Sequence, residues 1–132
     1  MRILAIDYGG KRIGLASGDS EHKIAFPRGI LENSPAFFGQ LKELCKKESI
    51  DRIIVGLPLG LSGQESAQTK KTRDFVDRLR QEIVTPVELI DERLTSAQAE
   101  KISEDTRRRK NVDDIAASLL LEQYFQAQKD LS

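Results

Sequence analysis

The chain has 132 residues, of which 39% are apolar, with 21 basic and 21 acidic side chains, one Cys and no Trp. This composition predicts a single globular domain over residues 1–132 and argues against a disordered chain, because apolar residues are plentiful and the formal net charge is zero. No apolar run approaches the ~20 residues that a membrane-spanning helix needs, and residues 1–7 lack the basic segment and cleavage site of a secretory signal, so we expect a cytoplasmic protein without a membrane partner.

The first part of the chain predicts three strands and one helix. Residues 2–6 are almost continuously apolar, which is typical of a central strand covered on both faces. Turn residues 8–11 separate them from a strand over 12–17, so these two strands form a hairpin. A third strand is expected over 23–31, where Pro27 indicates a sheet edge or a bulge.

A helix should follow, with Ser34 as its N-cap and Pro35 as its first residue. Its apolar stripe consists of Phe37, Phe38, Leu41, Leu44 and Cys45, which makes Cys45 a packing residue.

The second part of the chain alternates strands and helices. We expect a strand over 51–55, a loop over 56–63, a helix over 64–82 with Phe75, Val76 and Leu79 facing inward, and a strand over 86–90. Two helices end the chain, one from the N-cap Thr95 to Ile102 and one over 112–128. The order β-β-β-α-β-α-β-α-α predicts an α/β fold with a mixed sheet of five strands flanked by helices.

Two acidic residues are placed at the ends of predicted strands. Asp7 ends a strand that should be buried, so its carboxylate must be paired, hydrogen-bonded or bound to a cation. A hydrogen bond to the Gly9–Gly10 turn explains Asp7 equally well. Glu92 follows the fifth strand at its carboxyl end, where open α/β sheets commonly place ligands. Side chains alternate along a strand, so Asp91 and Glu92 cannot both face one site, and an exposed charged loop is the competing interpretation.

A third acidic residue is selected by helical periodicity. With about 100° per residue, the final helix is predicted to pack through Val112, Ile115, Ala116, Leu119, Leu120 and Tyr124. Asp113 falls inside this apolar arc, whereas Asp114 falls outside it and suits the first turn of a helix. An acid on a packing face is unusual, which favours Asp113 as the functional residue.

Together, Asp7, Glu92 and Asp113 suggest phosphodiester chemistry. Carboxylates at one edge of a mixed sheet can hold two Mg²⁺ or Mn²⁺ ions, one to activate water and one to stabilise the leaving oxygen. The neutral net charge argues against nucleic-acid binding by bulk electrostatics, and a short charge run is commonly only a solvated loop. The run Arg107, Arg108, Arg109 and Lys110 directly precedes Asp113, however, where a polyanionic substrate would need phosphate contacts.

Four motifs in sequence order resemble those of the YqgF/RuvX family. They are residues 7–14 (DYGGKRIG), residues 54–59 (IVGLPL) with Gly63, residues 91–95 (DERLT), and Val112–Asp113 with residues 115–117 (IAA). The match spans nearly the whole chain, and the triplet followed by Leu-Thr is its most distinctive part. Ser96 stands where the family often has Thr, which keeps the hydroxyl.

The resemblance implies an RNase H-like fold and a nuclease. The family is described both as Holliday-junction resolvases and as nucleases that mature the 5′ end of pre-16S rRNA, so it leaves structured RNA and branched DNA open as substrates. Its acidic residues carry over onto Asp7, Glu92 and Asp113. Lys11, Arg12, Arg93 and the run 107–110 are then the candidate nucleic-acid-binding residues, with Lys70 and Lys71 in reserve. A monomer and a homodimer both remain open.

Two other interpretations compete. Asp7 and the following glycines also resemble the first phosphate loop of actin-like ATPases and sugar kinases, but 132 residues leave no room for the second domain that closes over their nucleotide. A non-catalytic nucleic-acid-binding module of this fold could also retain the acidic residues. His22, the single histidine, lies in a predicted turn and gives little support to a histidine-based mechanism.

Overall fold

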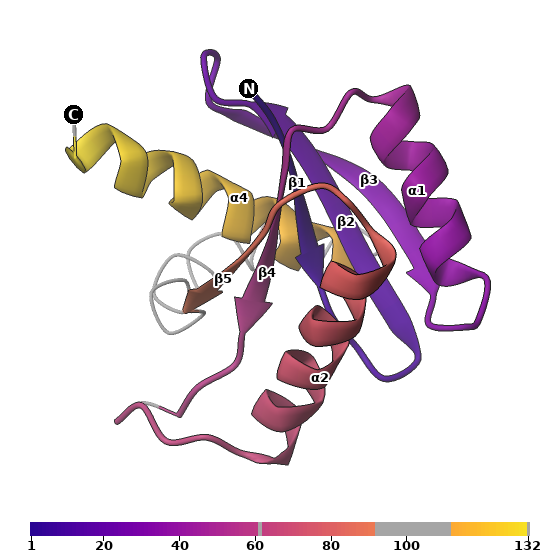
Figure 1. The fold of residues 1–132 in the computed structure, drawn as a ribbon. Helices are drawn as coiled ribbons and strands as arrows, with labels where there is room; N and C mark the ends of the chain where they lie inside the picture. Colours follow the sequence, from indigo (N-terminus) through magenta and orange to yellow (C-terminus); the bar gives the residue numbers. More distant parts are fainter. Residues whose placement is uncertain (61, 92–111, 132) are drawn as a thin grey trace.

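A computed structural model describes residues 1–60, 62–91 and 112–131, with 112–114 and 129–131 described as helix backbone. A five-stranded sheet has the order β3-β2-β1-β4-β5 (Figure 1). The strands are β1 (Arg2–Asp7), β2 (Arg12–Asp19), β3 (Ile24–Glu32), β4 (Arg52–Leu57) and β5 (Val87–Asp91). β1 pairs antiparallel with β2 and parallel with β4, so the sheet is mixed, as the element order predicts. The predicted helix over 95–102 lies outside the described residues.

The central strand β1 is covered on both faces, which explains its continuous apolar run. Leu4 and Ile6 belong to a core cluster under the helices α1 (Phe37–Lys47) and α2 (Ala67–Glu82). Ile3 and Ala5 belong to a second cluster under α4 (Val112–Leu131) on the opposite face. Residues 3–6 are all 0% exposed, so the prediction of a strand buried on both sides is confirmed.

The strand β3 is both an edge strand and a bulged one, as Pro27 predicts. Leu15 pairs with Gly29 whereas the next residue, Ala16, pairs with Pro27, so Arg28 is an extra residue in β3. Gly29 has a φ of 90°, a backbone conformation that side chains disfavour. Proline lacks an N–H donor, and an edge position is where a strand tolerates this loss.

The helix α1 begins later than predicted. Its N-cap is Ala36, without a side-chain cap, rather than Ser34. The backbone N–H groups of Ser34 and Phe37 donate instead to Glu32 O (3.0 Å) and Ser34 O (3.0 Å), so a turn uses these residues before the helix begins. The predicted packing role of Cys45 is confirmed: burial raises the pKa of its thiol to about 11, which keeps it neutral and unreactive near pH 7.

The helix α2 begins at Ala67 rather than at residue 64, because Ser66 caps it. The Ser66 hydroxyl accepts from Thr69 N, and the Thr69 side chain accepts from Ser66 N, a reciprocal capping box. Inward-facing Phe75, Val76 and Leu79 are buried, as predicted.

The helix α4 packs only partly through the side predicted: Ile115, Leu120 and Tyr124 are buried as expected, but the buried side extends further around the helix. Its residues in the core cluster are Ala117, Leu120, Leu121, Tyr124 and Phe125, whereas Ala116 and Leu119 are only half-buried. The sheet-facing side is therefore rotated by about one residue step, or about 100°, from the predicted arc. Its centre now lies between the helical positions of residues 113 and 114, so the packing side of α4 does not distinguish Asp113 from Asp114, and the choice of Asp113 stays a prediction.

No helix in the described ranges combines the length and the apolar character needed to cross a membrane.

Candidate active site

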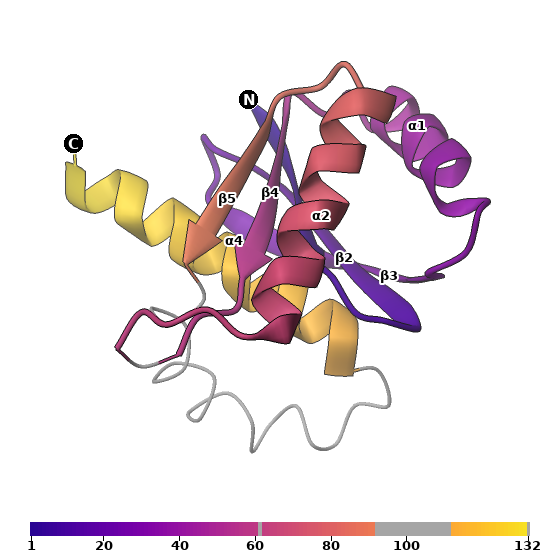
Figure 2. The same cartoon turned by 60° about the horizontal axis from the view of Figure 1, so that its bottom comes forward.

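The carboxyl ends of three parallel strands meet at one edge of the sheet. β1 is parallel to β4, and β4 is parallel to β5. Ile6 pairs with Val55, and Leu57 pairs with Asp91, so Asp7, Leu57 and Asp91 end neighbouring strands. The ends of β4 and β5, the beginning of α2 and the first turns of α4 all lie toward the lower side of Figure 2. We call this side of the molecule the carboxyl edge.

Asp7 is half-buried at the end of β1. Strand alternation places it on the same face as Ile3 and Ala5, which is the face that α4 covers. Asp91 alternates in phase with Leu89, whose side chain packs on the α1 and α2 face. Strand alternation therefore assigns Asp7 and Asp91 to opposite faces, although Asp91, at the very end of its strand, also lines a cavity with Gln123 and Gln128 of α4.

The turn after Asp7 is held by backbone constraints. A Cβ atom on Gly9 would lie 2.4 Å from Arg12 O, so this turn has no room for a side chain there. Asn33 Nδ2 donates to Gly9 O (2.9 Å), and Asn33 N donates to Lys11 O (2.9 Å). The hairpin that carries Lys11 and Arg12 is thus tied to the connection between β3 and α1.

The direction of α4 brings its beginning to the carboxyl edge. Near its C-terminal half, Tyr124 Oη accepts from Arg52 Nη1 (2.7 Å) at the start of β4. Phe125 packs on Gly18, where a Cβ would lie 3.1 Å from its ring, and Gly18 pairs with Ile3 near the start of β1. Residues earlier in α4 therefore lie toward the ends of β1 and β4, and Figure 2 shows the first turns of α4 on the same lower side as the end of β4.

The exposed basic residues of the described chain at this edge come from two segments. Lys11 and Arg12 lie in the β1–β2 turn and at the start of β2, next to Asp7 in sequence. Lys70 and Lys71 lie near the beginning of α2, which follows the loop after β4. Arg73 already forms an ion pair with Glu65, which weakens its ability to bind a phosphate.

Several predicted site residues have no described side chain. Glu92, Arg93 and the run 107–110 lie outside the described residues, and Asp113 is described only as backbone of α4. Among the described side chains, no three His, Cys, Asp or Glu residues gather in one place. His22 is exposed in the β2–β3 turn, at the opposite end of β1.

An aromatic cluster at the same edge was not anticipated as part of a site. Tyr8, directly after Asp7, stacks on Phe75 with ring centroids 4.3 Å apart. The Phe38 ring also lies near Phe75, with ring centroids 6.2 Å apart. The signal that could have found it is the spacing of Lys71, Phe75 and Arg78, which lie on one face of a helix.

Sequence comparison identifies the family. The family described as "RuvX: Holliday junction resolvase" matches residues 1–127. The chain belongs to the RuvX family. This confirms the resemblance seen in the four motifs, all of which lie within the matched residues.

Curated relatives of this RuvX-family chain carry a second description. A protein of Desulforudis audaxviator named "Putative pre-16S rRNA nuclease" is 40% identical, over 98% of this chain and 96% of its own length. A protein of Maridesulfovibrio salexigens with the same name is 38% identical, over 95% of this chain and 98% of its own length.

Solved structures confirm the fold class. Thermus thermophilus RuvC in complex with a Holliday junction substrate superposes with a TM-score of 0.63 at 16% identity, over 100% of this chain and 98% of that one. The Holliday junction resolvase of fowlpox virus superposes with a TM-score of 0.55 at 19% identity, over 96% and 99% of the two chains. At these identities the likeness extends to the RNase H-like fold of the RuvX-family chain.

The donor chemistry at the edge is compatible with Mg²⁺ or Mn²⁺. Both ions prefer oxygen ligands, and Asp7 supplies a half-buried carboxylate at the end of a rigid central strand. A half-buried carboxylate gains from a bound cation more than an exposed one does, because less solvent screens its charge.

Proposed function

We propose that this chain is a cytoplasmic, metal-dependent endonuclease that hydrolyses phosphodiester bonds in structured nucleic acid and processes the 5′ end of pre-16S rRNA. The observation that carries the proposal is the half-buried Asp7 carboxylate at the end of the central strand of a RuvX-family chain. The proposal is supported by the convergence of β1, β4, β5 and the beginning of α4 at one edge. In the sequence, Glu92 directly follows β5, and Asp113 is the second residue of α4.

In this proposal, Asp7, Glu92 and Asp113 together hold Mg²⁺ or Mn²⁺. When bound, the cations activate water and stabilise the charge that develops on the leaving oxygen. Asp7 is the fixed member of the set, since its strand is buried on both faces and hydrogen-bonded on both sides. Lys11 and Arg12 are exposed at the turn that follows Asp7 and are available to contact the phosphate backbone.

Cleavage of two substrates side by side tests the choice between RNA and DNA. We expect the purified protein with Mg²⁺ or Mn²⁺ to trim a pre-16S RNA fragment at its 5′ side and to leave a synthetic four-way DNA junction intact. The second candidate, a Holliday junction resolvase, is favoured by the description of the RuvX family itself. Symmetric cleavage of the junction with intact RNA would establish that candidate instead, and binding without any cleavage would indicate a non-catalytic module.

We further propose that Arg107, Arg108, Arg109 and Lys110 hold the substrate backbone near the metal site. Glu104 and Asp105 are too few to neutralise four consecutive cations. Replacing the three arginines with Ala should weaken binding of all sequences similarly and flatten the slope of log affinity against log salt by about one unit per lost phosphate contact.

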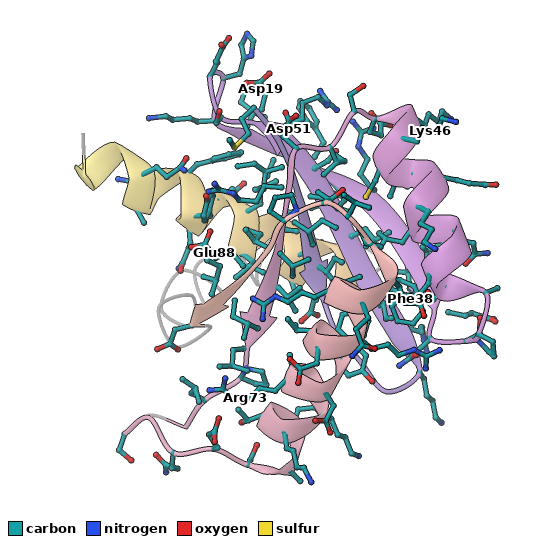
Figure 3. The ribbon with its side chains drawn as sticks, viewed as in Figure 1. Asp19, Phe38, Lys46, Asp51, Arg73 and Glu88 are labelled. Carbon is teal, nitrogen blue, oxygen red and sulfur yellow. The ribbon has the colours of Figure 1, made fainter. Side chains whose placement is uncertain are left out.

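A matched control is available at the other end of the sheet. Lys46 and Lys47 lie in the last turn of α1, and Figure 3 places Lys46 away from the carboxyl edge. Replacing both with Ala removes cations without touching the proposed surface, so the salt slope should stay at the wild-type value. An unchanged slope in the arginine variant would show that the run is a solvated loop and that Lys11, Arg12, Lys70, Lys71 and Arg93 must be tested next.

A further inference from the structure

A small cavity with aromatic and cationic walls opens beside the carboxyl edge, on the face opposite to Asp7. Its volume is about 270 Å³. Its walls are Tyr8, Asn33, Phe38, Lys71, Asp74, Phe75 and Arg78. We call this cavity the Tyr8 pocket. It is slightly smaller than the cavities that hold drug-sized ligands, which suits a single planar ring system.

Two of the aromatic side chains of the Tyr8 pocket are each inclined only slightly to the third, Phe75. The Tyr8 and Phe75 rings are inclined by 21°, and the Phe75 and Phe38 rings by 25°. The Arg78 guanidinium lies 4.9 Å from the centre of the Phe38 ring, a cation–π contact. Figure 3 places Phe38 at the start of α1, beside α2. Phe75 is 8% exposed, whereas Tyr8 and Phe38 are half-buried and retain accessible surface.

The charges around the Tyr8 pocket favour an anionic ligand. Lys71 and Arg78 are exposed cations, and Asp74 is the one acidic residue in the wall. Within the described residues, none of these three side chains takes part in an ion pair. Stacked rings beside unpaired cations are the combination by which proteins bind the base and the phosphate of a single-stranded nucleic acid.

We propose that the Tyr8 pocket binds one unpaired base of the nucleic-acid substrate by stacking, with Lys71 and Arg78 contacting a flanking phosphate. This inference rests on the proposed function, because it assumes a nucleic-acid substrate. It adds the requirement that one base of that substrate is unpaired. Asp7 and Tyr8 are consecutive residues whose side chains leave the end of β1 on opposite faces. A nucleic-acid strand that crosses the carboxyl edge at Asp7 can therefore place a neighbouring base in the Tyr8 pocket.

The ligand is a nucleotide within a strand rather than a free nucleotide. Free nucleotides are held through their phosphates by closely spaced backbone N–H groups or a glycine-rich loop. The Tyr8 pocket instead offers two separate long cationic side chains, Lys71 and Arg78, which suit the phosphates of a nucleic-acid strand that continues beyond the pocket.

Binding without cleavage tests the pocket separately from the catalytic proposal. The experiment uses the Asp7→Asn protein in buffer without divalent metal and a short single-stranded RNA that carries one 2-aminopurine, whose fluorescence falls when it stacks. We expect quenching on binding, and at least about fivefold weaker binding after an added Phe38→Ala change, since each stacked base contributes at this level. An added Phe38→Tyr change should retain the affinity.

Further variants separate stacking from damage to the fold. Phe26→Ala is the matched control, because Phe26 is 53% exposed on β3 and lies outside the pocket. Lys71→Ala and Arg78→Ala change exposed residues and should each weaken binding even if Phe38→Ala fails to fold. Equal affinity in all pocket variants, or unquenched 2-aminopurine in the bound complex, would overturn the proposal. If equimolar adenosine monophosphate displaces the RNA, the ligand of the pocket is a free nucleotide and the proposal of a strand is overturned.

The two proposals fail in different ways. Quenching by a protein that never cleaves RNA or DNA would leave the Tyr8 pocket standing and remove the nuclease assignment. If the wild-type protein cleaves its substrate and the pocket variants bind the RNA with unchanged affinity, the nuclease assignment stands and the pocket proposal fails.

Discussion

The Asp7→Asn variant is expected to lose at least about a hundredfold in cleavage rate while keeping its fold. Bound metal supplies several kcal/mol of transition-state stabilisation in such sites, and each 1.36 kcal/mol corresponds to a factor of ten in rate. Asn retains the size of Asp but loses the negative charge that holds the cation. The measurement is single-turnover cleavage with Mg²⁺ and with Mn²⁺, together with thermal unfolding of both proteins without metal.

A matched control exists for this change. Asp19 ends β2 next to the start of β1, and its carboxylate accepts from Glu21 N at 2.7 Å, far from the carboxyl edge. Asp19→Asn should cleave at the wild-type rate. The unfolding temperature of Asp7→Asn should stay the same or rise, because removing one charge relieves repulsion among clustered carboxylates. Full activity in Asp7→Asn would exclude this carboxylate as a metal ligand.

The second large effect is expected at the beginning of α4, where two consecutive acidic residues can be compared. Asp113→Asn should lose cleavage by a factor similar to that of Asp7→Asn, whereas Asp114→Asn should remain within a few-fold of the wild-type rate. The family motif, rather than the helical phase, selects Asp113. Because the variants differ by a single position in the same turn, each serves as the control for the other.

The opposite ranking would assign the metal ligand to Asp114. Loss of cleavage in both variants, with affinity for RNA unchanged, would mean that both carboxylates contribute to the site. Isothermal titration with Mn²⁺ separates these outcomes from a change in folding, since a lost ligand weakens metal binding directly.

The sheet could be predicted from sequence because its signals are local and mutually consistent. The apolar run of β1, the turn glycines after it and Pro27 in β3 each predict a specific position in the sheet, and the structure agrees with all of them. Helix beginnings were less predictable. Ser34 and Pro35 have the composition of a helix start, but the turn before α1 uses their backbone groups first.

The packing side of α4 could be predicted only in part because its sequence is apolar nearly all around between residues 115 and 121. Periodicity distinguishes a buried side only where polar residues mark the opposite one. Contacts with the sheet decide instead: Phe125 fits over Gly18, and Tyr124 reaches Arg52. These partners are more than 70 residues away in sequence, as in the Arg52–Tyr124 separation of 72, so no local pattern records them.

The candidate site was only partly predictable for a related reason. Asp7 is recognisable as an acid at the end of a buried strand, and the structure places it there, half-buried. The Tyr8 pocket combines the end of β1, the start of α1 and one face of α2. Each contribution alone reads as ordinary core packing, and only the tertiary structure brings the three together.

The bulge in β3 also affects how molecules of this protein meet one another. An edge strand offers unpaired backbone groups on which a strand from another molecule can add, and exposed Ile24 and Phe26, each 53% exposed, would favour such addition. Pro27 removes one donor, and the extra residue Arg28 and Gly29 break the regular spacing directly after it. The edge formed by β3 is thereby divided into two short stretches, which disfavours the addition of a long strand from another molecule at this edge.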